Sequence, residues 1–110
     1  MNREILRGEI YTTDLGLGIG SEHSGVKYCV VIQNNIGNKH STTTVVMPIT
    51  KEDKGMPTHY MIENTLPQTS YVVTEQIRVV DKERLKNKVA EISNNDMKGI
   101  CRKLKLELGI

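Results

Sequence analysis

The first half of the chain alternates short apolar runs with polar or glycine-rich breaks, which is the pattern of β-strands joined by loops. Residues 7–14 (RGEIYTTD) alternate apolar and polar side chains and predict a strand that ends before the glycine-rich segment 16–21. Residues 27–34 (KYCVVIQN) carry apolar side chains at successive positions, which predicts a central strand covered on both faces. The polar segment NNIGNKHST that follows predicts a connecting loop.

Three further strands are predicted between residues 42 and 80. Residues 42–50 (TTTVVMPIT) are rich in β-branched side chains, although Pro48 cannot donate a hydrogen bond and therefore predicts an edge or a bulge near the strand end. Residues 59–64 (HYMIEN) predict a short strand after a charged loop. Residues 70–80 (SYVVTEQIRVV) predict a longer strand that the polar residues 74–76 interrupt.

From residue 81 onward the apolar spacing changes to that of helices. Leu85, Val89 and Ile92 recur at helical intervals, and Asp81 is placed to cap the first turn. Ser93 is the expected cap of a second helix, whose apolar stripe consists of Met97, Ile100, Cys101, Leu104 and Leu108. Strands followed by helices predict an α+β domain built on an antiparallel sheet or a small barrel.

Composition narrows this picture to a single domain with an aliphatic core. The chain has 110 residues, of which 37% are hydrophobic and 25% charged, and it contains four Tyr but no Phe or Trp. Aromatic platforms on which nucleobases stack are therefore few. The net charge is only +2, so any nucleic-acid site must be a local cluster of cations and not the surface as a whole.

The cysteines and the N-terminus predict a cytoplasmic protein. Cys29 and Cys101 are far apart in the sequence, without a C-x-x-C motif or a zinc-ligand spacing, so we expect reduced, buried thiols and no metal site. The N-terminal residues lack the apolar region of an export signal, and no run of about 18 apolar residues predicts a membrane span.

Ionisable and hydroxyl side chains gather at the ends of the predicted strands. The segment GLGIGS resembles a dinucleotide-binding loop, but a strand and not a helix follows it, so its glycines predict loop hinges. Glu22 and His23 precede Lys27 and form either a solvated loop end or a cluster able to exchange protons near neutral pH. Thr50, at a strand end, is either an ordinary strand residue or a donor to a phosphate oxygen.

Several segments, in this order, resemble the MazF/PemK family of toxin endoribonucleases: RGEIY, GSEHSGVKYCVVIQNNIGNKHS, PIT, PTH, EQIRVVDKERL and the C-terminal LELGI. The most specific are the family motifs G-S-E-x-x-G-V-R-P-x-x-V-I-Q-N and E-Q-I-R-x-x-D-K. Because these segments span nearly the whole chain, we expect one MazF/PemK-like toxin domain over residues 1–110.

This resemblance implies a fold, an activity and partners. The fold is a small antiparallel SH3-like barrel of the CcdB/MazF type with short C-terminal helices, assembled as a homodimer. The activity is sequence-selective cleavage of single-stranded RNA without a metal ion or other cofactor. The partner is a cognate antitoxin whose flexible tail covers the RNA groove.

The resemblance also implies roles for individual residues. Lys27 takes the place of the catalytic arginine and Thr50 that of the catalytic threonine. The implied RNA-binding residues are Ser21, Glu22, His23, Thr58, His59, Glu75 and Gln76.

The chain departs from the family pattern at three places. It has Lys27-Tyr28 where the family usually has Arg-Pro, His23 where a glutamine is expected, and a slightly short loop between Thr50 and Pro57. The lysine leaves an alternative open, in which a catalytically weak or inactive relative binds RNA, DNA or a protein target. A third interpretation, a structural or assembly protein, predicts no RNA binding at moderate salt.

Overall fold

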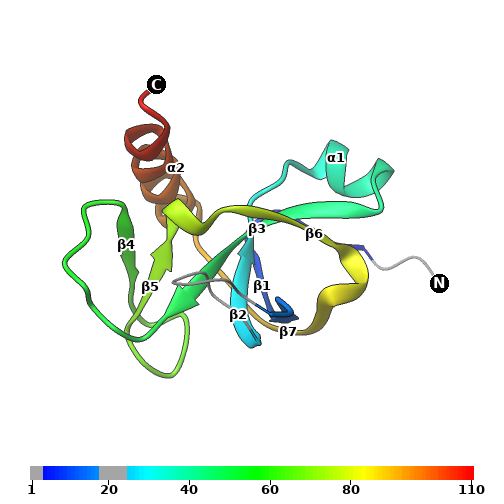
Figure 1. The fold of residues 1–110 in the computed structure, drawn as a ribbon, viewed down its shortest axis with the longest axis horizontal. Coiled ribbons are helices and arrows are strands. Elements are labelled where there is room, and N and C mark those ends of the chain that lie inside the picture. Colours follow the sequence, from blue (N-terminus) through cyan, green and yellow to red (C-terminus); the bar gives the residue numbers. More distant parts are fainter. Residues whose placement is uncertain (1–3, 18–24) are drawn as a thin grey trace.

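The computed structural model describes residues 4–17 and 25–110, which form an antiparallel sheet and two α-helices (Figure 1). The strands are β1 (Glu9–Asp14), β2 (Val26–Val31), β3 (Thr43–Thr50), β4 (His59–Ile62), β5 (Ser70–Val73), β6 (Arg78–Asp81) and β7 (Leu85–Glu91). The helices are α1 (Asn35–His40) and α2 (Asn94–Leu108), with 3₁₀ turns η1 (Thr74–Gln76) and η2 (Lys82–Arg84). The predicted α+β class and antiparallel sheet are confirmed.

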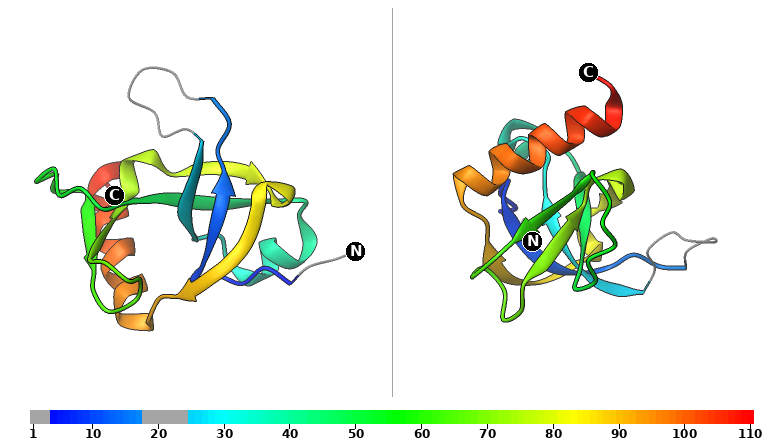
Figure 2. Two further views of the ribbon diagram at one scale, coloured as in Figure 1. Left: turned by 90° about the horizontal axis from the view of Figure 1, so that it is seen from below. Right: turned by 90° about the vertical axis from the view of Figure 1, so that its left-hand side faces the viewer.

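β3 is the central strand of this sheet. The strand order is β4-β5-β3-β2-β1-β7, and β6 also pairs with β3. One edge of β3 pairs with β2, while the other edge pairs first with β6, over residues 43–46, and then with β5, at residues 49–50. The sheet curves strongly as a result, which Figure 2 shows from two sides.

Pro48 lies in the short interval between the two partners of β3. The carbonyl of Val45 accepts a hydrogen bond from the amide of Ile32, next to β2, so alternation along the strand turns Pro48 toward the opposite edge. There β6 has ended and β5 has not begun. Pro48 is thus not on an edge strand, but its missing N–H falls where the pairing is interrupted.

Two hydrophobic clusters cover the two faces of the central strands. The first, between the sheet and α2, includes Val30 and Met47 together with Ile100 of the helix. The second, enclosed by the curved part of the sheet, includes Cys29 and Val31. Successive residues of β2 therefore enter different clusters, which confirms the prediction of a strand covered on both faces.

The prediction of a helix after Asp81 is wrong. Asp81 caps only the 3₁₀ turn η2, through a 2.9 Å hydrogen bond from the Glu83 amide to its carboxylate. The residues after the turn form β7, which pairs with β1 in an irregular register. A single C-terminal α-helix, α2, follows in the described part of the chain, and Ser93 caps it as predicted by accepting from the amide of Asp96.

The segment NNIGNKHST is also more ordered than the predicted loop. It contains α1, because the Asn34 side chain accepts from the Gly37 amide at 2.8 Å and supplies an N-cap. The polar interruption predicted at residues 74–76 is confirmed as the turn η1 between β5 and β6.

Both cysteines are free thiols, Cys29 buried and Cys101 half-buried, which differs from the expectation that both are buried. Among the described residues, no helix is both long and apolar enough to cross a membrane.

Candidate functional site

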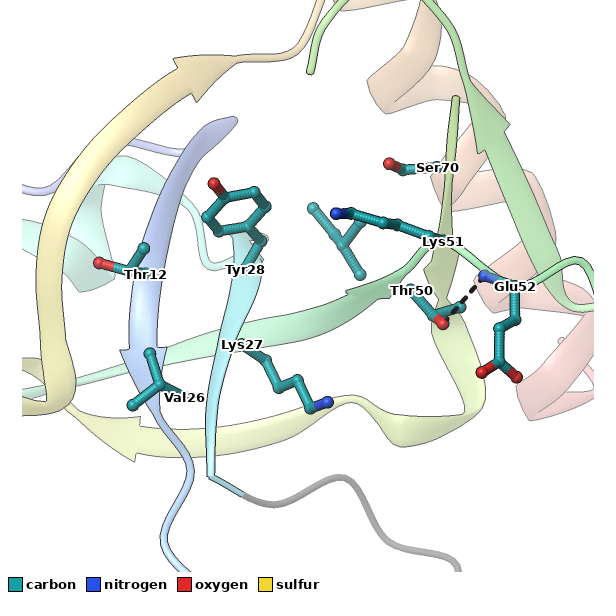
Figure 3. Close-up of a pocket in the computed structure, with 9 residues that line it drawn as sticks. Thr12, Val26, Lys27, Tyr28, Thr50, Lys51, Glu52 and Ser70 are labelled. Atoms are coloured by element: carbon teal, nitrogen blue, oxygen red, sulfur yellow. Dashed lines mark hydrogen bonds between the residues drawn. The ribbon is translucent and has the colours of Figure 1, made fainter. Parts of the chain in front are cut away.

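The predicted catalytic pair lies in one open pocket at the ends of β2 and β3 (Figure 3). The pocket has a volume of about 370 Å³. It is lined by Thr12, Val26, Lys27, Tyr28, Ile49, Thr50, Lys51, Glu52 and Ser70.

Strand register explains why Lys27 and Thr50 share this pocket. Cys29 pairs with Pro48 in the antiparallel ladder of β2 and β3. Continuing that register by two residues places Lys27 opposite Thr50, and opposite residues of an antiparallel pair project on the same face. Residues far apart in the sequence are thereby brought to one end of the sheet.

The side chains of this pair are available to a ligand. The Thr50 hydroxyl accepts a 3.2 Å hydrogen bond from the Glu52 amide, which fixes the oxygen and leaves its proton free to be donated. The Lys27 side chain is exposed and, within residues 4–17 and 25–110, it makes neither a hydrogen bond nor an ion pair. The same holds for Lys51. The lining thus carries two ammonium groups and a single carboxylate, that of Glu52, so the pocket is suited to an anion.

Thr58, His59 and Glu75 form a second cluster, outside the lining of the pocket. The Thr58 hydroxyl donates to one oxygen of Glu75 at 2.8 Å, and His59 Nε2 lies 2.8 Å from the other. The Thr74 hydroxyl donates to the Thr58 carbonyl, so β4 and η1 are joined at this point. These contacts tie down the end of the loop that starts at the pocket.

The electrostatics of Glu75 follow from these contacts. Burial by itself would raise the pKa of its carboxyl group, but hydrogen bonds from its own backbone amide, His59 and Thr58 outweigh this effect and lower the pKa. Glu75 is therefore a carboxylate held in its charged form. His59 faces it with a side chain that is only 5% exposed.

The predicted site residues thus fall into three groups. Lys27 and Thr50 meet in the pocket, whereas Thr58, His59, Glu75 and the half-buried Gln76 do not line it. Their contact with RNA stays a prediction. Ser21, Glu22 and His23 lie outside the described residues.

Tyr28 and Lys51 line the pocket but were not among the predicted site residues. Each directly follows a predicted catalytic residue in the sequence, and this adjacency is the signal that could have identified them. Within the described ranges, no group of three or more His, Cys, Asp and Glu side chains is placed to hold a metal ion.

A family model and a similar protein of known activity indicate the same family for this chain. A family model described as "PemK-like, MazF-like toxin of type II toxin-antitoxin system" matches residues 6–108. The endoribonuclease MazF of Staphylococcus saprophyticus is 40% identical over 109 residues, which cover 94% of this chain and 91% of that protein.

Solved structures share the fold over almost the whole chain. An endoribonuclease in complex with its cognate antitoxin, from a mycobacterial species, has a TM-score of 0.83 at 28% identity and covers 96% of each chain. MazF from Deinococcus radiodurans has a TM-score of 0.88 at 20% identity, covering 99% of this chain and 100% of that one, and this likeness supports the fold alone.

Proposed function

The chain belongs to the PemK-like, MazF-like family of type II toxin–antitoxin toxins, and on this premise we propose that it is a sequence-selective endoribonuclease that cleaves single-stranded RNA without a metal ion. The observation that carries the proposal is the pocket in which Lys27 and Thr50 lie together, with Lys27 unpaired among the described residues. The 40% identity to a MazF endoribonuclease supports the same activity.

Cleavage without a metal uses the ribose 2′-hydroxyl as the nucleophile. The 2′ oxygen forms a bond to phosphorus, the bond to the 5′ oxygen of the next nucleotide breaks, and the proton lost from the 2′-hydroxyl is balanced by one gained at the 5′ oxygen. The products are a 2′,3′-cyclic phosphate and a 5′-hydroxyl. The protein must therefore stabilise the charge of the phosphorane and assist two proton transfers.

Lys27 and Thr50 are suited to the electrostatic part of this reaction. Thr50 would donate its hydroxyl proton to a non-bridging oxygen of the scissile phosphate, and the Lys27 ammonium would stabilise the phosphorane. A lysine provides one compact charge where an arginine donates two parallel hydrogen bonds, so this exchange is not conservative. The Lys27 ammonium also carries a proton that it could donate to the departing 5′ oxygen.

The alternative function is binding without catalysis. The observation that favours it is Lys27 itself, which stands where the family has a catalytic arginine. In this case the same pocket would hold an RNA, DNA or protein ligand and leave it intact.

Partners follow from the same premise. We infer a homodimer of single-domain chains that acts on cytoplasmic RNA, and a cognate antitoxin as inhibitor. A solved relative that is 28% identical was captured in complex with its cognate antitoxin. An acidic antitoxin segment would compete with RNA for the unpaired ammonium groups of the pocket.

The test is incubation of the purified protein with a long unstructured RNA in EDTA, followed by mapping of the fragment ends. We expect discrete cuts that end in cyclic phosphate, and no cuts with Thr50→Ala. Lys27→Ala should lower the cleavage rate by about 10²-fold, because removal of one preorganised donor to a transition-state anion has an effect of this size.

Lys54→Ala is the matched control, since it removes a lysine from the neighbouring loop that pairs with Glu52 and does not line the pocket. It should cleave like wild type. Equal rates for Lys27→Ala and wild type would contradict the proposed role of Lys27. If the wild-type protein binds RNA without cutting it, and the Lys27→Arg variant does cut it, the binding function is established instead.

A further inference from the structure

The pocket presents two groups of side chains, one from each face of the sheet. Lys27 and Thr50 share one face, as the register of β2 and β3 requires. Val30 pairs with Met47, so the same register places Tyr28 opposite Ile49, and alternation puts Lys51 on the side of Ile49. Tyr28 and Lys51 therefore approach the pocket from the face opposite to that of the catalytic pair.

Figure 3 shows this division directly. The Lys51 side chain extends from the end of β3 toward the part of the pocket that Tyr28 occupies. The Lys27 side chain leaves β2 in a different direction from that of the Tyr28 ring. Ser70 of β5 lines the pocket on the side of Lys51.

The chemistry of Tyr28 and Lys51 matches one nucleotide. Tyr28 is half-buried against the core and is the aromatic residue of the pocket lining, with no hydrogen-bond partner for its hydroxyl among the described residues. An aromatic ring offers a surface on which any base can stack. Lys51 is exposed and unpaired within the described part of the chain, so its ammonium group can meet a phosphate.

We propose that Tyr28 and Lys51 form a subsite for the nucleotide that flanks the scissile phosphate. The base stacks on the Tyr28 ring and its phosphate binds the Lys51 ammonium, while Lys27 and Thr50 hold the phosphate that is cleaved. This inference rests on the proposed function. It assigns a role to the residue pair Lys27-Tyr28 as a whole: the tyrosine at the position of the usual proline adds binding beside the cation that acts on the phosphate.

The experiment uses an RNA with a mapped cleavage site and an analogue with a 2′-deoxy nucleotide at that site, which lacks the nucleophile. Binding of the analogue is measured by fluorescence anisotropy, and cleavage of the RNA gives kcat and KM. Tyr28→Leu should weaken binding about 10-fold, the size of one stacking interaction. Tyr28→Phe should bind the analogue as tightly as wild type, because the aromatic ring is retained.

Lys51→Ala tests the phosphate contact. It should weaken binding and lower the slope of log K against log salt by about 0.7, the contribution of one phosphate contact in a single strand. Both Tyr28→Leu and Lys51→Ala should raise KM more than they lower kcat, whereas Lys27→Ala should mainly lower kcat. Lys54→Ala again serves as the matched loss of one charge from the same loop.

Shortening the RNA by single nucleotides from each end identifies the nucleotide in the subsite. Its removal should weaken binding to wild type, weaken binding to Tyr28→Leu or Lys51→Ala to a smaller extent, and have no effect on the double variant that lacks both side chains. Circular dichroism verifies that Tyr28→Leu is folded, and the exposed Lys51 gives a variant that does not depend on core packing.

The outcomes separate the two proposals. A wild type that cleaves, with Tyr28→Leu and Lys51→Ala binding RNA as tightly as Lys54→Ala, would overturn the subsite and leave the endoribonuclease intact. A wild type that neither binds nor cleaves RNA would overturn the proposed function and the subsite with it.

Discussion

Glu75 shows how a single carboxylate links the stability of the protein to pH. Its pKa is lowered in the folded protein because the hydrogen bonds from its own amide, His59 and Thr58 outweigh the effect of burial. A group whose folded pKa lies below the unfolded one contributes stability that is fully present above the unfolded pKa. The contribution is lost as the pH falls from the ordinary value of 4.5 toward the lowered one.

We therefore expect Glu75→Gln to be less stable than wild type near neutral pH and to approach it in acid. The melting temperature of both proteins, measured from about pH 7 to about pH 3, checks this expectation. Glu63→Gln, which neutralises an exposed carboxylate, is the control and should follow wild type. Melting curves of Glu75→Gln and wild type that stay equally far apart at every pH would contradict it.

At the residue scale, the sequence predicted that Lys27 and Thr50 belong to one site, because both lie within recognisable motifs, and the structure places both in one pocket. It did not predict the grouping of Tyr28 with Lys51, since no motif contains both and only the strand register brings them together. The hydrogen bonds among Thr58, His59 and Glu75 could not be predicted from the sequence either. Ionisable residues in two distant motifs can bind each other as readily as they bind a ligand.

At the scale of elements, the contact of α2 with β4 depends on a glycine. A methyl group at Gly99 would lie 2.0 Å from Cε1 of Tyr60. The Tyr60 ring is held in place, because its hydroxyl donates to the Asp96 carboxylate at 2.7 Å. The helix therefore packs closely on the strand where the glycine leaves room for the ring.

Gly99→Ala should destabilise the protein by about 1–3 kcal/mol, because the extra methyl group overpacks this contact. The sign is diagnostic, since helix propensity alone would make alanine about 1 kcal/mol more favourable than glycine. In a Tyr60→Leu background the same substitution should be neutral or stabilising. Chemical denaturation of the two single variants and the double variant measures the difference, with the exposed Lys98→Ala as a control in the same helix.

The elements that the sequence predicted well are those whose burial repeats regularly. Residues of β2 enter the two core clusters alternately, and α2 buries Met97 and Ile100 on one side. The hydrophobic pattern in the sequence therefore predicts both elements. In β7 only Leu85 is buried, and its irregular pairing with β1 disrupts the period of two. The apolar residues of this segment, Leu85, Val89 and Ile92, happen to recur at helical intervals, which explains why a helix was predicted here.

At the scale of the whole molecule, Cys29 is a reporter of the closed core. Burial raises the pKa of its thiol to about 11, and the side chain belongs to the cluster enclosed by the curved sheet. The half-buried Cys101 is accessible from solvent. An alkylating reagent near pH 8 should therefore modify Cys101 first and Cys29 only when the domain opens.

Mass spectrometry of the Cys101→Ser variant isolates the reaction of Cys29. We expect its alkylation to be slow in buffer and to accelerate steeply in denaturant, across the same range in which circular dichroism records unfolding. Rapid alkylation of Cys29 in the native variant would show that the sheet opens without global unfolding.

The placement of β3 has a consequence for protein engineering. Thr50 ends a strand that three neighbours hold, β2, β5 and β6, whereas residues 51–57 immediately after it are irregular and exposed. Doubling the length of a flexible loop costs only about 0.6 kcal/mol in closure entropy, so new sequences and lengths can be introduced beyond Lys51 without displacing the threonine. Libraries randomised over residues 52–57 and selected on different RNAs would therefore change the surface beside the pocket while Thr50 keeps its place in the sheet.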